Sequence, residues 1–338
     1  MIKQDKVLVT GGAGYIGCVL TRELLKKGYK VTVLDSLEFN QLSLLPFVTD
    51  SNFTFIHGDV RNTTLLKKLV GDVDIVIPLA AIVGFPACNQ NPEVAKEINY
   101  VQVKNIVDWV EGTDKKVLYP NTNSGYGIGE DNTECTEESE LNPISVYGQT
   151  KVDAEKYILN KIDGICFRLA TVFGVSPRMR TDLLVNDFTY KALSDNYIVV
   201  FEKHFKRNYI HVQDVASVII FMIENYDKYK GNVFNVGLSS ANLSKQQLLE
   251  KIKTHIPNFN IVYSNYYKDP DKRDYIVSNK KIEKTGWKPT KTIDEGILEL
   301  IKAYKIIIPN MGREFRNSIP LGYFNTSSSS EFYEPTME

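Results

Sequence analysis

Residues 6–17 of the chain read Lys-Val-Leu-Val-Thr-Gly-Gly-Ala-Gly-Tyr-Ile-Gly, so a short apolar run leads into closely spaced glycines and then into a helical pattern. This order predicts a strand, a tight turn and a helix. Gly11 permits the turn, Gly14 lets a pyrophosphate approach the backbone at the start of the helix, and Gly17 lets the helix pack closely on the strand. The stretch therefore predicts the first unit of a dinucleotide-binding fold.

Strand-like and helix-like segments alternate through the first half of the chain. Several strands are apolar without alternation, which is typical of strands that are covered on both faces. We therefore expect an α/β protein with a doubly wound parallel sheet, a Rossmann fold. The expected strands are Lys6–Thr10, Lys30–Asp35, Phe53–His57, Ile75–Leu79, Lys116–Pro120 and Gly164–Leu169, and the expected helices are Tyr15–Lys27, Thr63–Val70, Pro92–Val110 and Ser145–Asn160.

Shorter elements follow in the second half. We expect residues 1–177 to form the cofactor-binding domain, with residues of about 207–237 returning to it. Residues 178–308 are expected to form mainly a smaller, interleaved α/β region that binds substrate. Residues 309–338 have few periodic apolar positions and are expected to form a tail.

Composition excludes several classes of protein. With 338 residues, 43% hydrophobic and 24% charged, the chain is neither disordered, collagen-like nor a disulfide scaffold. A net charge of -1 gives no general attraction to nucleic acid or anionic membranes. The four cysteines lack metal-type spacing, so we expect buried thiols and no metal site. With no signal-peptide pattern and no membrane-length apolar run, a cytoplasmic protein is expected.

Further candidate residues follow the next strands, at the edge where ligands of open α/β sheets bind. Asp35 ends the second strand, where a carboxylate can accept both hydroxyls of an adenosine ribose and would repel a 2′-phosphate. It therefore favours NAD over NADP as the cofactor. Asp59 follows the third strand and Leu79-Ala80-Ala81 follows the fourth, so these residues are expected near the adenine and nicotinamide ends.

Tyr147 and Lys151 occupy positions i and i+4 on one face of an expected helix. Other Tyr–Lys pairs share this spacing, but this helix follows the loop with Thr122 and Ser124 at the end of the fifth strand. Oxidising a secondary alcohol with NAD needs a base, and a phenol with a pKa of about 10 is a poor one near neutral pH. A neighbouring lysine ammonium and the nicotinamide ring favour the phenolate. Thr122 or Ser124 would then hold the substrate hydroxyl, and Lys151 the nicotinamide ribose.

More motifs follow in order: Gly58-Asp59-Val60, Asn99, Tyr126-Gly127, residues 207–212 with Asp214, and Gly286-Trp287-Lys288-Pro289. With the glycine turn and the Tyr–Lys pair, they resemble the extended short-chain dehydrogenases/reductases that act on nucleotide sugars, the epimerase and dehydratase group. The resemblance spans about residues 6–305. It implies a nucleotide-diphosphate sugar as substrate, NAD kept during turnover, and often a homodimer built from the helices Pro92–Val110 and Ser145–Asn160.

The same resemblance implies a set of site residues. Thr122, Tyr147 and Lys151 would be catalytic. Contacts to NAD would come from Gly11, Gly14, Tyr15, Ile16, Gly17, Asp35, Asp59, Val60, Leu79, Ala80, Ala81, Asn99, Tyr147 and Lys151. Contacts to substrate would come from Val83, Asn123, Ser124, Arg178, Arg180, Arg207 and Arg273, whose guanidinium groups suit a diphosphate.

Dehydratases of this family carry an acidic pair directly after the catalytic Thr, where this chain has Asn123 and Ser124. Neither residue can act as a carboxylate, so we expect oxidation at C4 without dehydration. The 4-keto sugar is then either re-reduced, as in a UDP-glucose/UDP-galactose type 4-epimerase, or released, as in a 4-dehydrogenase. Residues 79–88, 120–127 and 201–209 resemble a subgroup that includes GDP-heptose 4-dehydrogenases of bacterial capsule synthesis.

Two further interpretations remain for a dinucleotide-binding fold. A redox-sensing regulator binds NAD without chemistry, and the fold alone does not exclude it. The Thr122, Tyr147 and Lys151 set argues against a sensor, which needs no base beside the nicotinamide. An NADPH-dependent sugar reductase would have to recognise a 2′-phosphate, and Asp35 opposes that.

Overall fold

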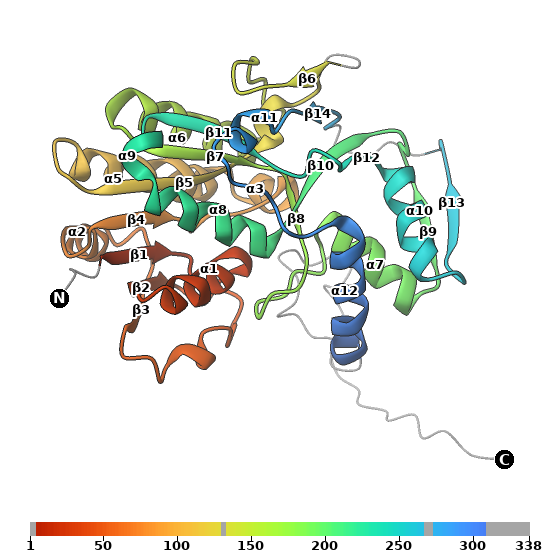
Figure 1. Ribbon diagram of the computed structural model, residues 1–338, viewed down its shortest axis with the longest axis horizontal. Helices are drawn as coiled ribbons and strands as arrows, with labels where there is room; N and C mark the ends of the chain where they lie inside the picture. Colours follow the sequence, from red (N-terminus) through yellow and green to blue (C-terminus); the bar gives the residue numbers. More distant parts are fainter. Residues whose placement is uncertain (1–4, 130–132, 267–272, 309–338) are drawn as a thin grey trace.

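Seven parallel strands form the central sheet of the computed structural model, which describes residues 5–129, 133–266 and 273–308 (Figure 1). Their order is β11-β7-β5-β4-β1-β2-β3. The chain extends from β1 to one edge and then returns to the other side, so the doubly wound sheet that we expected is confirmed. The strands are β1 (Lys6–Thr10), β2 (Lys30–Asp35), β3 (Phe53–His57), β4 (Ile75–Pro78), β5 (Lys116–Thr122), β7 (Ile165–Leu169) and β11 (Asn232–Val236).

Helices cover both faces of this sheet. Val7 and Val9 of β1 belong to the core under α1 and α8, whereas Leu8 belongs to the core under α2 and α5. Successive strand residues point to opposite faces, so two covered faces explain why the strand is apolar throughout. The covering helices are α1 (Tyr15–Lys26), α8 (Val212–Glu224), α2 (Thr63–Gly71), α5 (Gln102–Val110) and α6 (Val146–Lys161).

A smaller lobe lies to the right of the sheet in Figure 1. Its helices α7, α10 and α12 pack on one another. Between α7 and α10 the chain returns to the central sheet, where α8 packs on α1 and β11 pairs with β7. The lobe and its connections contain α7 (Leu184–Ser194), α10 (Lys245–His255), α12 (Ile293–Ile307), β8 (Thr171–Phe173), β9 (Tyr197–Val200), β10 (Lys206–His211), β12 (Asn242–Ser244), β13 (Asn260–Tyr263), and the pair β6 (Glu134–Cys135) and β14 (Ile276–Val277).

One expected helix is interrupted. In place of a single helix over Pro92–Val110, α4 (Pro92–Lys96) passes through a π-helical turn, η2 (Glu97–Val101), into α5. Such turns often mark functional sites, and this one contains Asn99. The remaining short helices are η1 (Leu45–Phe47), α3 (Phe85–Gln90), η3 (Asn123–Tyr126), α9 (Tyr226–Tyr229) and α11 (Lys280–Glu283).

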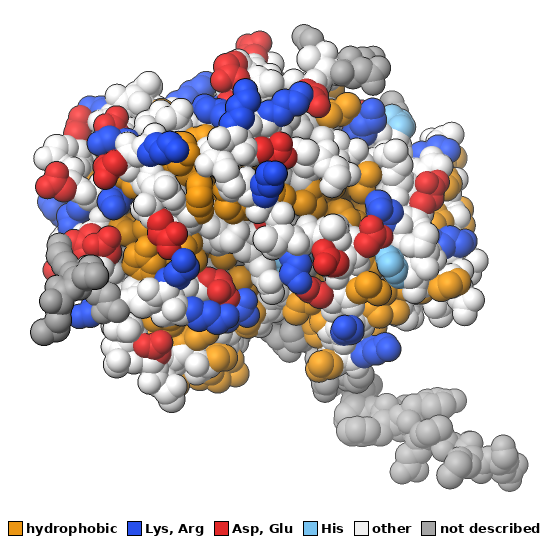
Figure 2. Space-filling view, in the orientation of Figure 1, with side chains coloured by type: hydrophobic (Ala, Val, Ile, Leu, Met, Phe, Trp, Pro, Cys, Tyr) orange, Lys and Arg blue, Asp and Glu red, His pale blue; other side chains and the backbone are white. Residues whose placement is uncertain are grey.

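The mixed surface charge and the burial of the cysteines are what the composition predicts. All four cysteines are buried and none of them forms a disulfide, which confirms the prediction of buried thiols. Figure 2 shows positive and negative side chains interspersed over one face of the molecule. Within the described ranges, none of the helices combines the length and the apolar character that a membrane span requires. The expected tail, residues 309–338, lies outside the described residues.

Candidate active site

A cavity of about 900 Å³ lies at the carboxyl ends of the central strands, between the sheet and the smaller lobe. Ligands of doubly wound sheets bind at this edge, where the strand order reverses. Most of the predicted site residues line this one cavity in the described part of the chain. The predicted residues that line the cavity are Gly11, Gly14, Tyr15, Ile16, Gly17, Asp35, Asp59, Val60, Leu79, Ala80, Ala81, Val83, Thr122, Ser124, Tyr147, Lys151, Arg178, Arg180, Arg207 and Arg273.

The glycine turn has little room on one side and an open face on the other. Gly11 has a φ of +70°, and a Cβ there would lie 2.7 Å from the backbone nitrogen of Ala80. A Cβ on Gly17 would lie 2.4 Å from the carbonyl oxygen of Gly11. A Cβ on Gly14 would meet only that same oxygen, at 3.1 Å, so this backbone faces the cavity. The turn therefore fits a pyrophosphate at the N-terminus of α1.

Asp35 lies at the other end of the cofactor side. Its buried carboxylate accepts hydrogen bonds from the backbone N–H groups of Ala13 and Leu37, both at 2.9 Å, and from Gln41 at 3.3 Å. Burial raises the pKa of Asp35, and its hydrogen bonds oppose that shift. Because a carboxylate has about four acceptor positions, Asp35 can still accept a ribose hydroxyl. These residues fit an NAD ribose.

Arg178 lines the cavity together with the other predicted arginines and acts on the carboxylate of Asp35. Its guanidinium is 4.8 Å from the ring centre of Phe39, and its charge lowers the pKa of Asp35. The sequence had grouped Arg178 with the arginines for the substrate diphosphate. The sequence alone does not reveal that Arg178 contacts the ring of Phe39 and Arg180 the carboxylate of Asp182.

Asn99 and Asn123 are the two predicted site residues that do not line the cavity. The Asn99 amide accepts a hydrogen bond from the backbone of Ile82 at 2.9 Å and donates one to the Ile82 carbonyl at 3.0 Å. It therefore holds the loop after β4 from behind. Asn123 is 1% exposed, and neither polar atom of its amide has a hydrogen-bond partner in the described part of the chain.

Thr122 ends β5 and caps η3. Its hydroxyl donates to the Ser124 hydroxyl at 2.9 Å and accepts from the backbone N–H of Ser124 at 3.1 Å. Arg273 also donates a hydrogen bond to the Ser124 hydroxyl. The two hydroxyls are therefore held together at the floor of the cavity, with a cation beside them.

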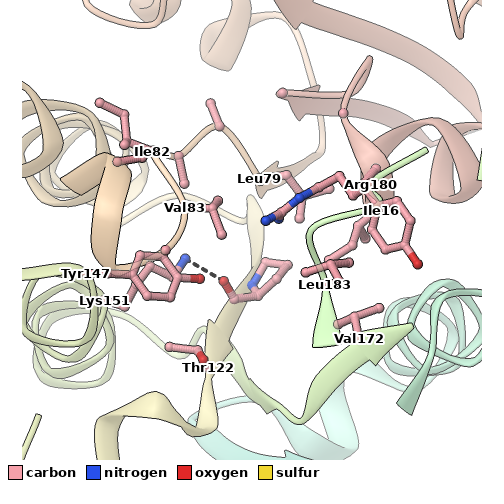
Figure 3. Close-up of a pocket in the computed structure, with 18 of the residues that line it drawn as sticks. Ile16, Leu79, Ile82, Val83, Thr122, Tyr147, Lys151, Val172, Arg180 and Leu183 are labelled. Atoms are coloured by element: carbon pink, nitrogen blue, oxygen red, sulfur yellow. Dashed lines mark hydrogen bonds between the residues drawn. The ribbon is translucent and has the colours of Figure 1, made fainter. Parts of the chain in front are cut away.

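Tyr147 and Lys151 project from α6 toward Thr122, as Figure 3 shows. Ser145 caps the start of this helix through the N–H of Gly148. The Lys151 ammonium donates to the carbonyl oxygen of Pro120 at 2.6 Å and lies 4.0 Å from the ring centre of Tyr119. The strand that carries Thr122 thus also anchors Lys151.

The positive charges that act on the Tyr147 hydroxyl come from residues other than the lysine that we expected. Burial raises the pKa of Tyr147 to about 12, and the side chains whose positive charge opposes this shift are Arg180 and then Arg273. Burial lowers the pKa of Lys151 to about 7. In the protein alone, the two arginines therefore favour the phenolate, a role that the sequence suggested for the lysine.

Arg180 points into the cavity from the side opposite Tyr147 (Figure 3) and is held by Asp182 at 2.7 Å. Arg207 on β10 is buried, with its guanidinium 5.6 Å from the ring centre of Tyr275. The sequence reading missed several lining residues of the smaller lobe. They include Asp182, Leu183, Leu184, Asp187, Lys245 and Tyr275, and no local motif distinguishes them from ordinary surface residues.

The low pKa of Lys151 makes folding stability depend on pH. Between about pH 7 and the usual lysine value of about 10.4, the unfolded chain binds more protons than the folded one. The free energy of unfolding therefore gains up to about 1.4 kcal/mol per pH unit from this group. Lys151→Met is expected to flatten the rise measured by urea unfolding between about pH 7 and pH 8, and cysteine titration contributes equally to both proteins. If the free energy of unfolding rose equally with pH in the parent and in Lys151→Met, the pKa of Lys151 would not be lowered as stated.

Comparison with known proteins agrees with this geometry. The model of the "NAD dependent epimerase/dehydratase family" matches residues 7–237. UDP-glucose 4-epimerase of Lactobacillus helveticus is 28% identical over 327 residues, covering 89% of this chain and 97% of that protein. CDP-paratose 2-epimerase of Salmonella typhi is 25% identical, covering 87% and 98%.

Solved structures share the fold. UDP-glucuronic acid 4-epimerase from Bacillus cereus, in complex with UDP-glucuronic acid and NAD, superposes with a TM-score of 0.79 at 24% identity, covering 89% of this chain and 99% of that one. UDP-glucose 4-epimerase from Thermotoga maritima gives a TM-score of 0.78 at 23% identity, covering 89% and 99%. Because the family match covers more than half of the chain, this protein belongs to the NAD dependent epimerase/dehydratase family, and its cofactor is NAD.

Proposed function

We propose that this protein is an NAD-dependent nucleotide-sugar 4-dehydrogenase that acts on a GDP-heptose in capsule polysaccharide synthesis. The observation that carries the proposal is the meeting of Thr122, Tyr147 and Lys151 in one cavity, with Asn123 and Ser124 instead of an acidic pair directly after Thr122 in the sequence. Relatives of this chain include UDP-glucose 4-epimerases and the capsule-named Protein CapI of Staphylococcus aureus. The subgroup itself rests on the resemblance of residues 79–88, 120–127 and 201–209.

The chemistry assigns a proton step to the protein. The bound NAD supplies a hydride acceptor and a positive ring. Tyr147, as phenolate, takes the proton of the sugar 4-hydroxyl while the C4–H bond breaks and the C4 carbonyl forms. Thr122 and Ser124 hold that hydroxyl by hydrogen bonds, and the positive charge of Arg180 and Arg273 favours the phenolate.

The residues after Thr122 decide which step follows oxidation. Asn123 and Ser124 offer no carboxylic acid or carboxylate, so water is not removed from the 4-keto sugar. Release of that sugar leaves NADH, which a 2-oxo acid can reoxidise with one proton to give NAD and the 2-hydroxy acid. Re-reduction inside the site would make the protein a 4-epimerase, the second candidate, which the UDP-glucose 4-epimerase relative favours.

We also propose which regions of the chain hold NAD and the nucleotide sugar, and that the protein forms a dimer. Residues 1–177 and about 207–237 hold NAD, and the rest of 178–308 mainly holds the nucleotide sugar, with Arg207 and Arg273 on its diphosphate. Two copies pair through α5 and α6 and their flanking turns. Chain mass by light scattering would test the dimer, and a monomer at all concentrations would contradict it.

Purified protein with GDP-heptose and a 2-oxo acid tests the reaction. Without the 2-oxo acid, absorbance at 340 nm is expected to rise once, as the bound NAD is reduced. With the 2-oxo acid, mass analysis is expected to show a 4-keto sugar that has lost two hydrogens and no water. Protein that leaves GDP-heptose unchanged but equilibrates UDP-glucose with UDP-galactose would instead be the 4-epimerase. Protein that binds NAD and oxidises none of a panel of nucleotide sugars would be the non-catalytic sensor.

A further inference from the structure

A buried ion pair lies directly behind the catalytic helix. Glu155 on α6 and Arg168 on β7 are 2% and 6% exposed at their side chains. The Arg168 Nη2 donates to Oε1 of Glu155 at 2.8 Å, and its Nε lies 3.2 Å from both carboxylate oxygens. Apolar residues of similar volume often replace such a pair without loss of stability. Stability alone is therefore a weak reason for its presence.

The position of Glu155 links it to both elements of the site. It lies one helical turn after Lys151, so both side chains share one face of α6. Its Oε2 also accepts a hydrogen bond from the Asn121 side chain at 2.5 Å. Asn121 stands between Pro120, whose carbonyl holds Lys151, and Thr122. One carboxylate thus contacts the strand end and faces the lysine.

Lys151 needs such a partner because its surroundings disfavour charge. It is 5% exposed, and burial lowers its pKa to about 7, while Cys166 and Glu155 act in the opposite direction. The groups that face it from the packed elements are Tyr147 and Glu155 on α6, Tyr119 on β5 and Cys166 on β7, with Arg168 beyond Glu155.

Arg168 keeps this carboxylate in place. The Nη1 of Arg168 donates hydrogen bonds to the Tyr126 hydroxyl at 2.9 Å and to the Glu137 carbonyl oxygen at 3.0 Å. The guanidinium is therefore fixed by the loop after β5 as well as by Glu155. Held from both sides, the Glu155 carboxylate cannot turn away from Asn121 without leaving buried groups unpaired.

We infer that Glu155, clamped by Arg168, is a positioning residue that favours the charged form of Lys151 and fixes the end of β5 through Asn121. The inference rests on the proposed function, in which Lys151 would hold the nicotinamide ribose. It extends the active site one layer beyond the groups that touch substrate or cofactor. It also accounts for a buried ion pair whose stabilising value alone is small.

Titration of the lysine side chains by NMR tests this inference without any substrate. In protein labelled with ¹³Cε-lysine, the Lys151 signal is expected to titrate near pH 7, far below ordinary lysines. Lys151→Met identifies the signal by its loss. Glu155→Gln keeps the side-chain volume and removes the charge, so the midpoint is expected to fall by about one pH unit.

Matched variants separate charge from packing. Asp153→Asn removes a carboxylate from the same helix, one that bonds Gln149 at 2.8 Å, and is expected to leave the midpoint unchanged. Because Glu155→Gln leaves Arg168 buried without its anion, the double variant Glu155→Gln/Arg168→Gln provides a second protein without an unpaired charge. Its midpoint is expected to fall as well.

An unchanged midpoint in a folded protein that carries Glu155→Gln, alone or in the double variant, would overturn the inference. A purely structural role would lower the melting temperature and leave the Lys151 titration in place. The proposed function fails separately, because protein that leaves GDP-heptose unchanged can still show the shift. Equally, full oxidation with an unshifted lysine would refute only the role of Glu155.

Discussion

Tyr147→Phe is expected to slow oxidation of the nucleotide sugar by about 10²- to 10⁴-fold, the range that a positioned proton acceptor contributes. Phenylalanine fills the same space on α6 but has no oxygen to take the proton of the 4-hydroxyl. Burial already raises the pKa of this phenol to about 12, so the active phenolate depends on nearby positive charge. Single-turnover formation of NADH, followed at 340 nm with GDP-heptose, measures the effect.

The same helix offers a matched control. Tyr157 and Lys161 repeat the i, i+4 spacing, but the Tyr157 hydroxyl bonds Asp108 at the surface. The Tyr157→Phe protein is expected to oxidise the substrate at the parent rate. The Tyr147→Phe protein is expected to bind NAD with the affinity of the parent. Equal rates for Tyr147→Phe and the parent would show that another group takes the proton.

Gly17→Ala is expected to destabilise the protein by about 3 kcal/mol, the upper end of the usual cost of overpacking. The added Cβ would lie 2.4 Å from the Gly11 carbonyl oxygen and 2.6 Å from the Cα of Gly12. Both are backbone atoms of the turn, so α1 must move away from β1. Urea unfolding, followed by circular dichroism, measures the loss.

Two other glycines serve as controls for this effect. At Gly71, near the end of α2, no atom lies within 4 Å of an added Cβ, so Gly71→Ala is expected to leave stability unchanged or to raise it. At Gly14 the added methyl would enter the cavity, so Gly14→Ala is expected to keep the fold and weaken NAD binding in calorimetry. A Gly17→Ala protein as stable as the parent would show that α1 can shift freely.

The pattern of neighbouring residues predicted those turns, strands and helices whose formation depends on residues close together in the chain. The glycine turn, the apolar strands and the helix of Tyr147 follow from φ requirements, burial on two faces and residue spacing, and they lie where we expected them. Boundaries differed by a few residues, as for β5, which ends at Thr122 instead of Pro120. The π-turn at Asn99 was missed because a one-residue insertion in helical pitch leaves the apolar pattern almost unchanged.

Residues close together in the chain were enough to predict the doubly wound class, an NAD cofactor and the pairing of Tyr147 with Lys151 on one helical face. Other features depend on contacts between distant segments: which cations act on Tyr147, the contact of Arg178 with Phe39, and the support that Asn99 gives to the loop after β4. Lys245 and Tyr275 likewise reach the cavity only through the return of distant segments. Long-range packing sets where a flexible side chain ends, and the electrostatic environment of a buried group depends on all of its neighbours.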